Sequence, residues 1–331
     1  MNKLVFLSIL LLIGTVRAAD PILIIHGGAG TITSEHAAHK RIGMVASIRA
    51  GFQVLLDTDN PMDAVEAAIH VLESSPAFNA GYGSVLTENG EIEMDAIVIN
   101  GTDLTAGAVG AMKHVLHPIS VARFVMNSTE HVFLVGEFAE KFAESRGIPL
   151  VPTSELIANS TGGKMGVKSH LGRKIRSSYD DVGTVGAVAI NSKGNIVAGT
   201  STGGLTGKME GRVGDAPLVG SGTLADDDVA GISATGDGEA FIRWRVASRV
   251  ASLIEQGVNA SEAILTVLNG MTNKIPGTSG GCIAITKDGE IGFQWNSEHL
   301  AWAYVKGSNM TIHYGVEKGE DQTTPFTVVA S

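Results

Sequence analysis

The chain has 331 residues, 44% of them hydrophobic, and a net charge of −10. Such an acidic chain repels phosphate groups, so we expect neither nucleic acid nor an anionic membrane as a partner. Cys282 is the only cysteine in the sequence, which excludes an intrachain disulfide. We interpret it as a small buried hydrophobe.

Residues 1–18 have the pattern of a secretory signal peptide. Lys3 supplies the positive start, residues 4–16 an apolar core, and Val16-Arg17-Ala18 the small residues of a cleavage site. The apolar core is too short to span a bilayer, and we expect no membrane span elsewhere. The sequence therefore predicts an exported protein, periplasmic or secreted, whose mature chain begins near Ala19.

The first half of the mature chain predicts two helices after a short strand. The strand, residues 21–25, runs into His26-Gly27-Gly28-Ala29-Gly30, which we interpret as a glycine turn because it lacks the lysine of a P-loop and the dinucleotide spacing. One helical face follows, made by Ile42, Val45, Ile48, Phe52 and Leu55. Asn60-Pro61 begins a second helix that turns Val65, Ile69 and Leu72 inward.

Further strands are predicted over residues 84–87, 92–99 and 106–111, then helical segments from residue 121 to 146 around the apolar run 132–135. From residue 153 to about 183 the chain is rich in Ser, Gly, Lys and Arg without a hydrophobic period. This composition predicts a flexible linker. Its basic character indicates solvation, with partner binding as the alternative.

The second half predicts two hairpins and two helices. The first hairpin pairs residues 184–190 with 195–199, and a strand follows at 229–234. Helices are expected over residues 242–254, closed by Gly257, and over 261–271, before a last hairpin of residues 282–285 and 291–295. Strands and helices in this order, without a βαβ rhythm, predict an α+β fold of sheets covered by helix layers.

Gly183-Thr184 opens the first of these hairpins. Inside a chain, Thr184 is an ordinary residue at the start of a core strand. If the Gly183–Thr184 bond were cut, however, Thr184 would gain an α-amine with a pKa of roughly 7.7–8.0 as its own base. A threonine beside its own amine is a known activated nucleophile.

Residues downstream could complete such a site. Thr202 ends the partner strand of the hairpin and could return close to Thr184. Arg212 offers a fork for a carboxylate and Asp215 an acceptor for an ammonium, so together they could hold an amino-acid zwitterion; alternatively they form a local surface ion pair. Thr235 and Gly236 lie in a glycine turn that could serve as an oxyanion hole.

Four ordered motifs carry a resemblance to a known family. They are Gly183-Thr-Val-Gly-Ala-Val-Ala, Thr200-Ser-Thr-Gly-Gly, Gly211-Arg-Val-Gly-Asp-Ala-Pro-Leu-Val-Gly and Ala234-Thr-Gly-Asp-Gly-Glu. The chain resembles the plant-type (type 2) L-asparaginase and isoaspartyl aminopeptidase family of N-terminal nucleophile hydrolases. The likeness includes His26-Gly-Gly-Ala-Gly and Phe78-Asn-Ala-Gly-Tyr-Gly and spans nearly the whole mature chain.

The resemblance implies a four-layer αββα sandwich and autocleavage into an α-chain, residues 19–183, and a β-chain, residues 184–331, which together form one domain. It implies that Thr184 is the nucleophile and, through its amine, the general base, and that Thr202 supports its hydroxyl. Arg212 would bind the substrate α-carboxylate, and Asp215 with the Gly238 carbonyl would bind the α-ammonium. Thr235 and Gly236 would stabilise the oxyanion, and Asn79 would have a supporting role. The substrates would be β-aspartyl peptides, L-asparagine or both, with release of L-aspartate.

The resemblance also implies that no catalytic cofactor is needed and that two αβ units form an (αβ)2 assembly. A structural sodium would be held by main-chain carbonyls of Leu72, Glu73, Ser75, Phe78, Ala80 and Tyr82, although Ser74-Ser75 departs from the more acidic loop expected there.

Two alternatives remain open at the level of sequence. Glycosylasparaginase shares the nucleophile and the Arg-Val-Gly-Asp motif, but typically has Thr-Asn-Gly where this chain has Thr202-Gly203-Gly204. A secreted amino-acid-binding protein would keep Arg212 and Asp215 without cleavage, and the presence of all three threonines argues against it.

Overall fold

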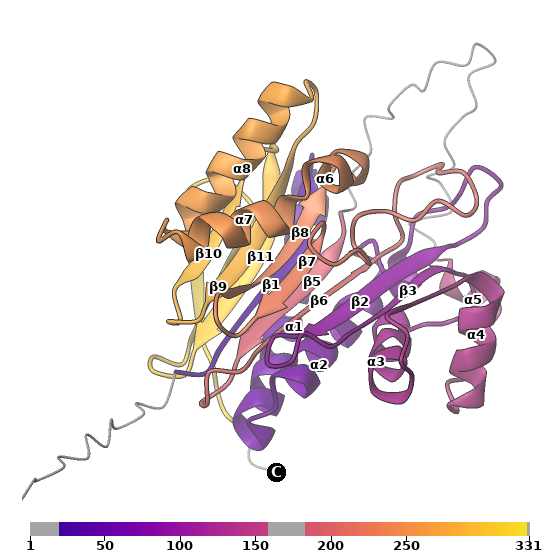
Figure 1. Ribbon diagram of the computed structural model, residues 1–331, viewed down its shortest axis with the longest axis horizontal. Coiled ribbons are helices and arrows are strands. Elements are labelled where there is room, and N and C mark those ends of the chain that lie inside the picture. Colours follow the sequence, from indigo (N-terminus) through magenta and orange to yellow (C-terminus); the bar gives the residue numbers. More distant parts are fainter. Residues whose placement is uncertain (1–19, 158–182, 330–331) are drawn as a thin grey trace, which may run out of the picture.

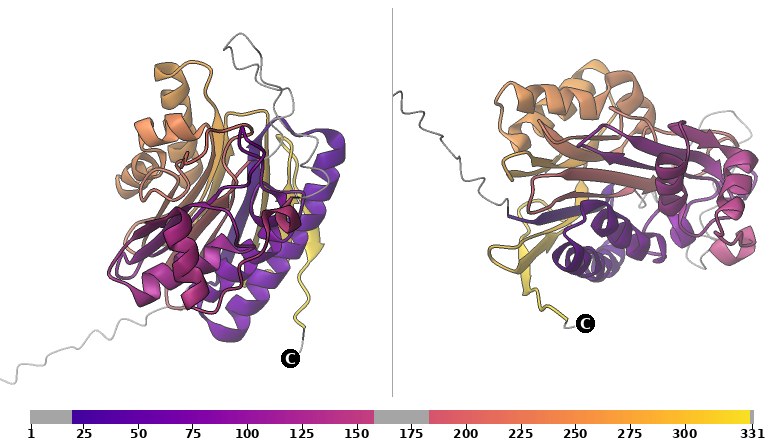
Figure 2. Two further views of the ribbon diagram at one scale, coloured as in Figure 1. Left: turned by 90° about the vertical axis from the view of Figure 1, so that its right-hand side faces the viewer. Right: turned by 60° about the horizontal axis from the view of Figure 1, so that its bottom comes forward.

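The computed structural model describes residues 20–157 and 183–329. Two β-sheets stack face to face, and helices cover the outer face of each, so that the chain forms four layers (Figures 1 and 2). The α+β fold and the αββα sandwich that the resemblance implies are confirmed. The predicted signal peptide, residues 1–18, lies outside the described residues.

The larger sheet has nine strands, and its middle is made from both halves of the chain. Its spatial order is β13-β12-β11-β1-β5-β6-β2-β3-β4. These strands are β13 (Gln322–Pro325), β12 (Thr311–Gly315), β11 (His299–Lys306), β1 (Ile22–Gly30), β5 (Val185–Ile190), β6 (Ile196–Thr202), β2 (Met94–Asn100), β3 (Ala106–Met112) and β4 (Phe133–Val135). Neighbouring strands pair antiparallel, except that β3 and β4 are parallel.

The smaller sheet has four antiparallel strands in the order β10-β9-β8-β7. They are β10 (Ile291–Trp295), β9 (Gly280–Thr286), β8 (Ala230–Gly236) and β7 (Thr223–Asp226). The predicted hairpins β5–β6 and β9–β10 are both confirmed.

Helices α1 (Ser34–Thr58), α2 (Pro61–Glu73) and α3 (Pro118–Ser128) cover the large sheet, while α7 (Val246–Glu255) and α8 (Ala260–Lys274) cover the small one (Figure 2). The shorter helices are η1 (Gly81–Gly83), α4 (Gly136–Ser145), α5 (Thr153–Leu156) and α6 (Gly238–Trp244). Within residues 20–157 and 183–329, none of the helices combines the length and apolar character that a membrane span needs.

Three apolar cores lie between the four layers of helices and sheets, and side chains that alternate between the two faces of each strand form them. In β1, Leu23 and Ile25 pack toward the helices, whereas Ile24 joins Val188 and Ile283 between the two sheets. Because successive side chains of a strand point to opposite faces, a strand buried on both sides must be apolar throughout. This is why residues 21–25 and 184–190 read as continuous apolar runs.

The predicted helical faces are largely confirmed. Val65, Ile69 and Leu72 are fully buried, and the Asn60 side chain caps α2 by accepting from the backbone N–H groups of Met62 and Asp63. The prediction for Ile42 is wrong, since 70% of it is exposed. Helix α1 turns Met44, Ser47 and Gly51 inward instead. The small residues Ser47 and Gly51 let it pack closely on Ala68 of α2.

Three other expectations are wrong in part. Residues 84–87 form no strand, and only Leu86 pairs with Ile92 in an isolated bridge. The expected linker begins with the helical turn α5, whose Leu156 is buried against Leu86 and Met94; residues 158–182 lie outside the described part of the chain. The helix expected over residues 242–254 is broken at Arg245, which has a φ of 56°.

Other elements were missed at the level of sequence. The strands β7, β11, β12 and β13 were not predicted. The glycine-rich segment after residue 25 is not a free turn but continues β1, with a bulge between His26 and Ala29 where it pairs with β11. One βαβ crossover, from β3 through α3 to the parallel strand β4, departs from the expected absence of a βαβ rhythm.

We expect Phe52→Ala to lower the free energy of unfolding by about 3–5 kcal/mol. Phe52 is fully buried on α1, and its ring packs edge-on against Phe326 at 5.1 Å, so truncation leaves a cavity between the first helix and the C-terminal segment. Urea denaturation followed by circular dichroism measures the change. Ile42→Ala on the same helix is the matched control and should cost less than about 0.5 kcal/mol. Equal losses in both variants would contradict this packing.

Candidate active site

A cavity of about 380 Å³ opens where the two sheets meet the segment 203–215. Its wall is formed by Ala29, Gly30, Thr31, Gly183, Thr184, Thr202, Gly204, Leu205, Thr206, Arg212, Asp215, Gly236, Asp237, Gly238, Ser279, Ser297 and Glu298. Residues from both halves of the chain therefore enclose one space. All the predicted nucleophile and substrate-binding positions are among them.

The pairing of β5 with β6 brings Thr184 to Thr202. Val185 lies opposite Ser201, so the residue before β5 and the last residue of β6 are neighbours. The hydroxyl of Thr184 donates to that of Thr202 at 3.0 Å. The proximity that the hairpin predicts is thus present, and a Thr184 alkoxide would lie beside a hydrogen-bond donor.

The turn after Thr202 is held by Asn79. The Gly204 N–H donates to the Thr202 hydroxyl at 3.0 Å. Asn79 binds this turn twice: its backbone carbonyl accepts from Gly203 N–H at 2.9 Å, and its side-chain amide donates to the Gly204 carbonyl at 2.7 Å. Asn79 is buried and absent from the cavity wall, which places it as a support of Thr202 rather than as a substrate ligand.

Gly183 lies directly against the bulge of β1. A Cβ added at Gly28 would come within 2.6 Å of the Gly183 Cα, and a Cβ added at Gly183 would come equally close to the backbone of Ala29. Gly28 also has a φ of 103°, which side chains disfavour. Both positions therefore require glycine, and the strand clamps the residue that precedes Thr184.

Arg212 and Asp215 converge on Gly238 at the start of α6. A Cβ at Gly238 would lie 2.6 Å from the Arg212 Nη2 and 2.7 Å from the Asp215 Oδ1. The Arg212 fork does not bind Asp215, however. It donates through Nε and Nη2 to the two carboxylate oxygens of Glu239, each at 3.1 Å, so the alternative of a local Arg212–Asp215 surface pair is not found.

Asp215 is a buried carboxyl on the wall of the cavity. Only 5% of it is exposed, and its Oδ2 has no hydrogen-bond partner among the described residues. Burial raises the pKa of Asp215 to about 7, although the nearby Arg212 acts in the opposite direction. An ammonium group at this oxygen would supply the missing partner and favour the ionised form.

Buried polar groups beneath the cavity anchor the segment that carries Arg212. The Asp95 carboxylate accepts from Ala111 N–H at 2.9 Å and from Gly214 N–H at 3.1 Å. Lys208 is buried, and its ammonium donates to the Glu93 carbonyl at 2.7 Å. Burial lowers the pKa of Lys208. These contacts fix both ends of a segment that has no regular secondary structure.

Thr235 and Gly236 end β8 next to β1. The Thr235 hydroxyl accepts from the Ala29 N–H at 3.2 Å and keeps its own proton for donation. Gly236 lines the cavity, but Thr235 is fully buried and does not. The two predicted oxyanion donors are thus adjacent in the uncut chain, and only Gly236 lines the cavity.

His26 is close to Thr184 but is not a base. Burial lowers the pKa of His26 to about 3, against the opposing effect of the Thr184 backbone. Its Nε2 contacts the Ser233 hydroxyl at 2.8 Å, and Thr200 continues this hydrogen-bonded row at 2.7 Å. The ring is therefore a neutral part of the packing between the sheets.

The predicted carbonyl loop surrounds the turn η1. A Cβ at Gly81 would lie 2.3 Å from the Glu73 carbonyl oxygen and 2.7 Å from that of Leu116. At Gly83 it would lie 2.0 Å from the Phe78 oxygen and 2.9 Å from that of Ser75. The carbonyl oxygens of Glu73 and Leu116 therefore lie beside Gly81, and those of Phe78 and Ser75 beside Gly83. Leu116 belongs to this group and was not predicted.

Several residues of the site were missed at the level of sequence. Glu239 stands in the quoted motif that begins at Ala234, but nothing in the motif indicates that it pairs with Arg212. Thr31, Ser297 and Glu298 line the cavity on the β1 side, and they carry no recognisable motif. Only the fold brings the ends of β1, β10 and β11 together there.

Comparison with known proteins agrees with this geometry. The asparaginase family profile matches residues 19–315. The isoaspartyl peptidase/L-asparaginase of Bos taurus is 40% identical over 304 residues, covering 91% of this chain and 97% of the relative. The proteins of the same name from Homo sapiens and Mus musculus are 39% and 41% identical, over 92% and 91% of this chain and 98% and 92% of their own lengths.

A match of this extent, together with the αββα layers and the threonine at the start of a central strand, identifies the family. The chain is a hydrolase of the asparaginase family and has the fold of an N-terminal nucleophile hydrolase.

Proposed function

We propose that the chain cuts itself before Thr184 and that the processed enzyme hydrolyses β-aspartyl peptides and L-asparagine, releasing L-aspartate. The observation that carries this proposal is the single cavity lined by Thr184, Arg212 and Asp215. A nucleophile and two opposite charges enclosed in one space fit an amino acid whose side-chain amide is cleaved. The names of the relatives support the same substrates.

Self-processing would begin with attack of the Thr184 hydroxyl on the carbonyl carbon of Gly183. The C–N bond between the two residues then breaks, the acyl group moves to the oxygen, and water hydrolyses the resulting ester. The products are a carboxylate at Gly183 and a free amine at Thr184. The contact between Gly183 and the β1 bulge supports this step, because it fixes the scissile carbonyl relative to the nucleophile.

In the processed enzyme, the free amine of Thr184 would accept the hydroxyl proton as the oxygen attacks the substrate amide. Thr202 would stabilise the developing charge on this oxygen by hydrogen bonding. Thr235 and the Gly236 N–H would donate to the tetrahedral oxyanion. The leaving amine takes a proton, and water then releases aspartate from the ester. The chemistry of the family needs no catalytic cofactor.

Arg212 and Asp215 would select the aspartyl half of the substrate. The Arg212 fork suits the α-carboxylate, which would displace Glu239 from it. Asp215, together with the Gly238 carbonyl, would receive the α-ammonium. Because the Asp215 Oδ2 has no hydrogen-bond partner among the described residues, a substrate ammonium would form a charge-assisted bond there without displacing an internal group.

Two alternatives are less well supported. Glycosylasparaginase typically has Thr-Asn-Gly where this chain has Thr202-Gly203-Gly204. An uncleaved amino-acid-binding protein would not need the Thr184–Thr202 contact. Denaturing gel electrophoresis distinguishes the cleaved enzyme from the uncleaved binding protein. An uncleaved chain gives one band near 34 kDa, and a cleaved chain gives two smaller bands.

The proposal includes a bound cation, an assembly and a location. The carbonyls of Leu72, Glu73, Ser75, Phe78, Ala80 and Tyr82, with that of Leu116, would hold a sodium ion that rigidifies the loop carrying Asn79. Two processed αβ units would form an (αβ)2 assembly. The pattern of residues 1–18 supports export to the periplasm or the medium.

Thr184→Ala should leave an uncut chain, because no hydroxyl remains to attack Gly183. Mass spectrometry and N-terminal sequencing measure the outcome, and the wild type should yield a second N-terminus that reads Thr-Val-Gly-Ala. Thr206→Ala removes another hydroxyl of the cavity wall and is the matched control, with normal processing expected. An active wild type that lacks the new N-terminus would refute self-processing.

Arg212→Lys should reduce kcat/KM for asparagine by about 30- to 5,000-fold, since an ammonium cannot reproduce the bidentate fork. Steady-state kinetics of processed protein measures this loss. Arg243→Lys, on α6 with one hydrogen bond to the Glu239 carbonyl, is the matched control and should stay within about twofold. Near wild-type kcat/KM in Arg212→Lys would remove Arg212 from the carboxylate site.

Asp215→Asn should stabilise the chain at pH 8 by up to about 4 kcal/mol, and by progressively less as the pH falls toward 4. With a folded-state pKa near 7 against 3.8 when unfolded, the folded chain binds the extra proton between these values, so wild-type stability falls as pH rises through this window. Urea denaturation in a Thr184→Ala background, which keeps one chain, measures the difference. A stabilisation equal at pH 4.5 and pH 8 would contradict the raised pKa.

A further inference from the structure

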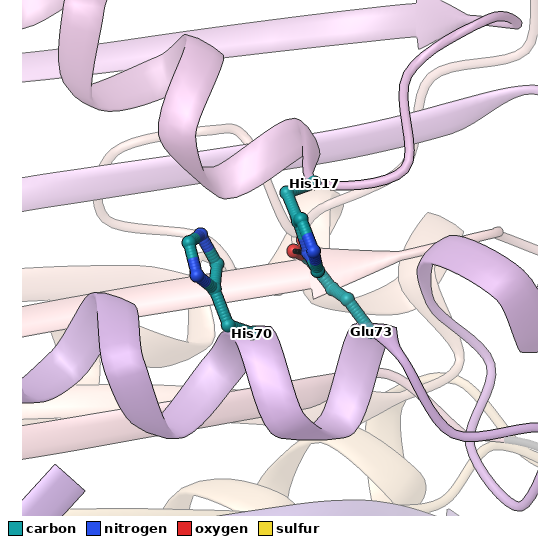
Figure 3. A group of neighbouring side chains, drawn as sticks. All are labelled: His70, Glu73 and His117. Atoms are coloured by element: carbon teal, nitrogen blue, oxygen red, sulfur yellow. Dashed lines mark hydrogen bonds and ion pairs between the residues drawn. The ribbon is translucent and has the colours of Figure 1, made fainter. Parts of the chain in front are cut away.

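Where α2 ends against α3, two histidines meet a buried carboxylate (Figure 3). His70 and Glu73 are three residues apart on the last turn of α2, and His117 directly precedes α3. One ligand atom of each lies within 4.8 Å of the others. This cluster is separate from the catalytic cavity, whose wall contains none of the three.

We propose that His70, Glu73 and His117 form a binding site for a late first-row divalent metal ion, of which Zn²⁺ is the typical example. Two imidazoles and one carboxylate are a ligand set that such ions favour over Na⁺, Ca²⁺ or Mg²⁺. The site uses the Glu73 side chain, whereas the carbonyl loop uses only its main-chain oxygen. The two cations would therefore be distinct in chemistry and in position.

The spacing of Glu73 and His117 already suits a shared ion. The Glu73 Oε2 lies 3.0 Å from the His117 Nδ1. Two ligand atoms each about 2.1 Å from a tetrahedral Zn²⁺ are separated by about 3.4 Å, so binding would part the Glu73 Oε2 and the His117 Nδ1 by a few tenths of an ångström. An ion could thus replace the proton between them without moving either main chain. The imidazole keeps one proton, which shifts from Nδ1 to Nε2, so no net deprotonation is needed.

The hydrogen bonds of His70 leave one of its nitrogens available. Ser120 donates its only hydroxyl proton to Glu66 at 2.6 Å, so its oxygen must accept from the His70 Nε2–H at 2.6 Å. The His70 Nδ1 then carries the free lone pair.

The rings of His70 and His117 are stacked at 4.2 Å with 29° between their planes. Ligand nitrogens of parallel rings do not point at one ion, so His70 must turn to join the other two. Its side chain is 37% exposed, so the ring has room to turn. The turn would exchange the bond from the His70 Nε2–H to Ser120 for a bond to the ion.

Glu73 has the orienting partners that metal-binding carboxylates commonly have. It is fully buried, and its Oε1 accepts from the Ser201 hydroxyl at 2.6 Å and the Ile119 N–H at 3.2 Å. These bonds hold the carboxylate so that Oε2 faces the histidines. Ser201 directly precedes Thr202 on β6. The proposed ion would therefore be linked, through Glu73 and Ser201, to the residue beside Thr202.

The test is a titration of untagged, processed and EDTA-treated protein with Co²⁺, followed by visible absorption, and with Zn²⁺, followed by calorimetry, in buffer of constant NaCl. We expect one site per αβ unit, ligand-field bands with Co²⁺, and a melting temperature raised by a few degrees with Zn²⁺. His70→Phe and His117→Phe keep a ring in the stack but remove a ligand, and each should weaken binding by at least about tenfold.

His131→Phe is the matched control, because His131 is an exposed histidine beyond the other end of α3. It should bind Co²⁺ as the wild type does. Circular dichroism of every variant establishes that it is folded, and His70→Gln replaces His70→Phe if that variant is not. Wild-type protein that binds no Co²⁺, or folded His70 and His117 variants that bind it with unchanged affinity, would overturn the proposal.

Discussion

The antiparallel pairing of β5 with β1 on one side and β6 on the other is the constraint on which the rest of the site depends. It sets Thr184 beside Thr202 and presses Gly183 against the β1 bulge. Because β1 and β2 precede residue 184 while β5 and β6 follow it, the two halves of the chain interleave in one sheet. A cut before Thr184 would therefore leave both pieces joined by ladder hydrogen bonds and by a shared core.

A second constraint is electrostatic. Arg212 pairs with the exposed Glu239, whereas the Oδ2 of the buried Asp215 has no hydrogen-bond partner among the described residues. Burying a carboxyl oxygen without a hydrogen-bond partner costs folding free energy, and the proposed substrate ammonium would offset that cost when it binds. Asp95 accepts from the Gly214 N–H, and the buried Lys208 donates to the Glu93 carbonyl. These bonds hold the segment 203–215 in place around the Asp215 carboxyl.

The sequence predicted what local pattern controls and missed what tertiary contact controls. The β5–β6 hairpin, and with it the Thr184–Thr202 contact, follows from two apolar runs around a short turn. Tertiary contacts between distant segments decide that Arg212 pairs with Glu239, that Asp215 is buried and that Glu298 lines the cavity. No local sequence pattern encodes these contacts. Ile42 was misplaced because its helix packs through small residues, and the break at Arg245 because nothing in a continuous apolar face signals a residue with positive φ.

Glu73 connects features that otherwise look separate. Its main-chain carbonyl belongs to the oxygen-lined loop around η1, its Oε2 contacts His117, and its Oε1 holds Ser201 one residue before Thr202. A buried carboxylate with three kinds of partner cannot move for one without disturbing the others. The end of α2 is thus mechanically tied to the strand that supports the nucleophile. A cation at the histidines would act on the strand of Thr202 through the Glu73 carboxylate, which lies outside the wall of the catalytic cavity.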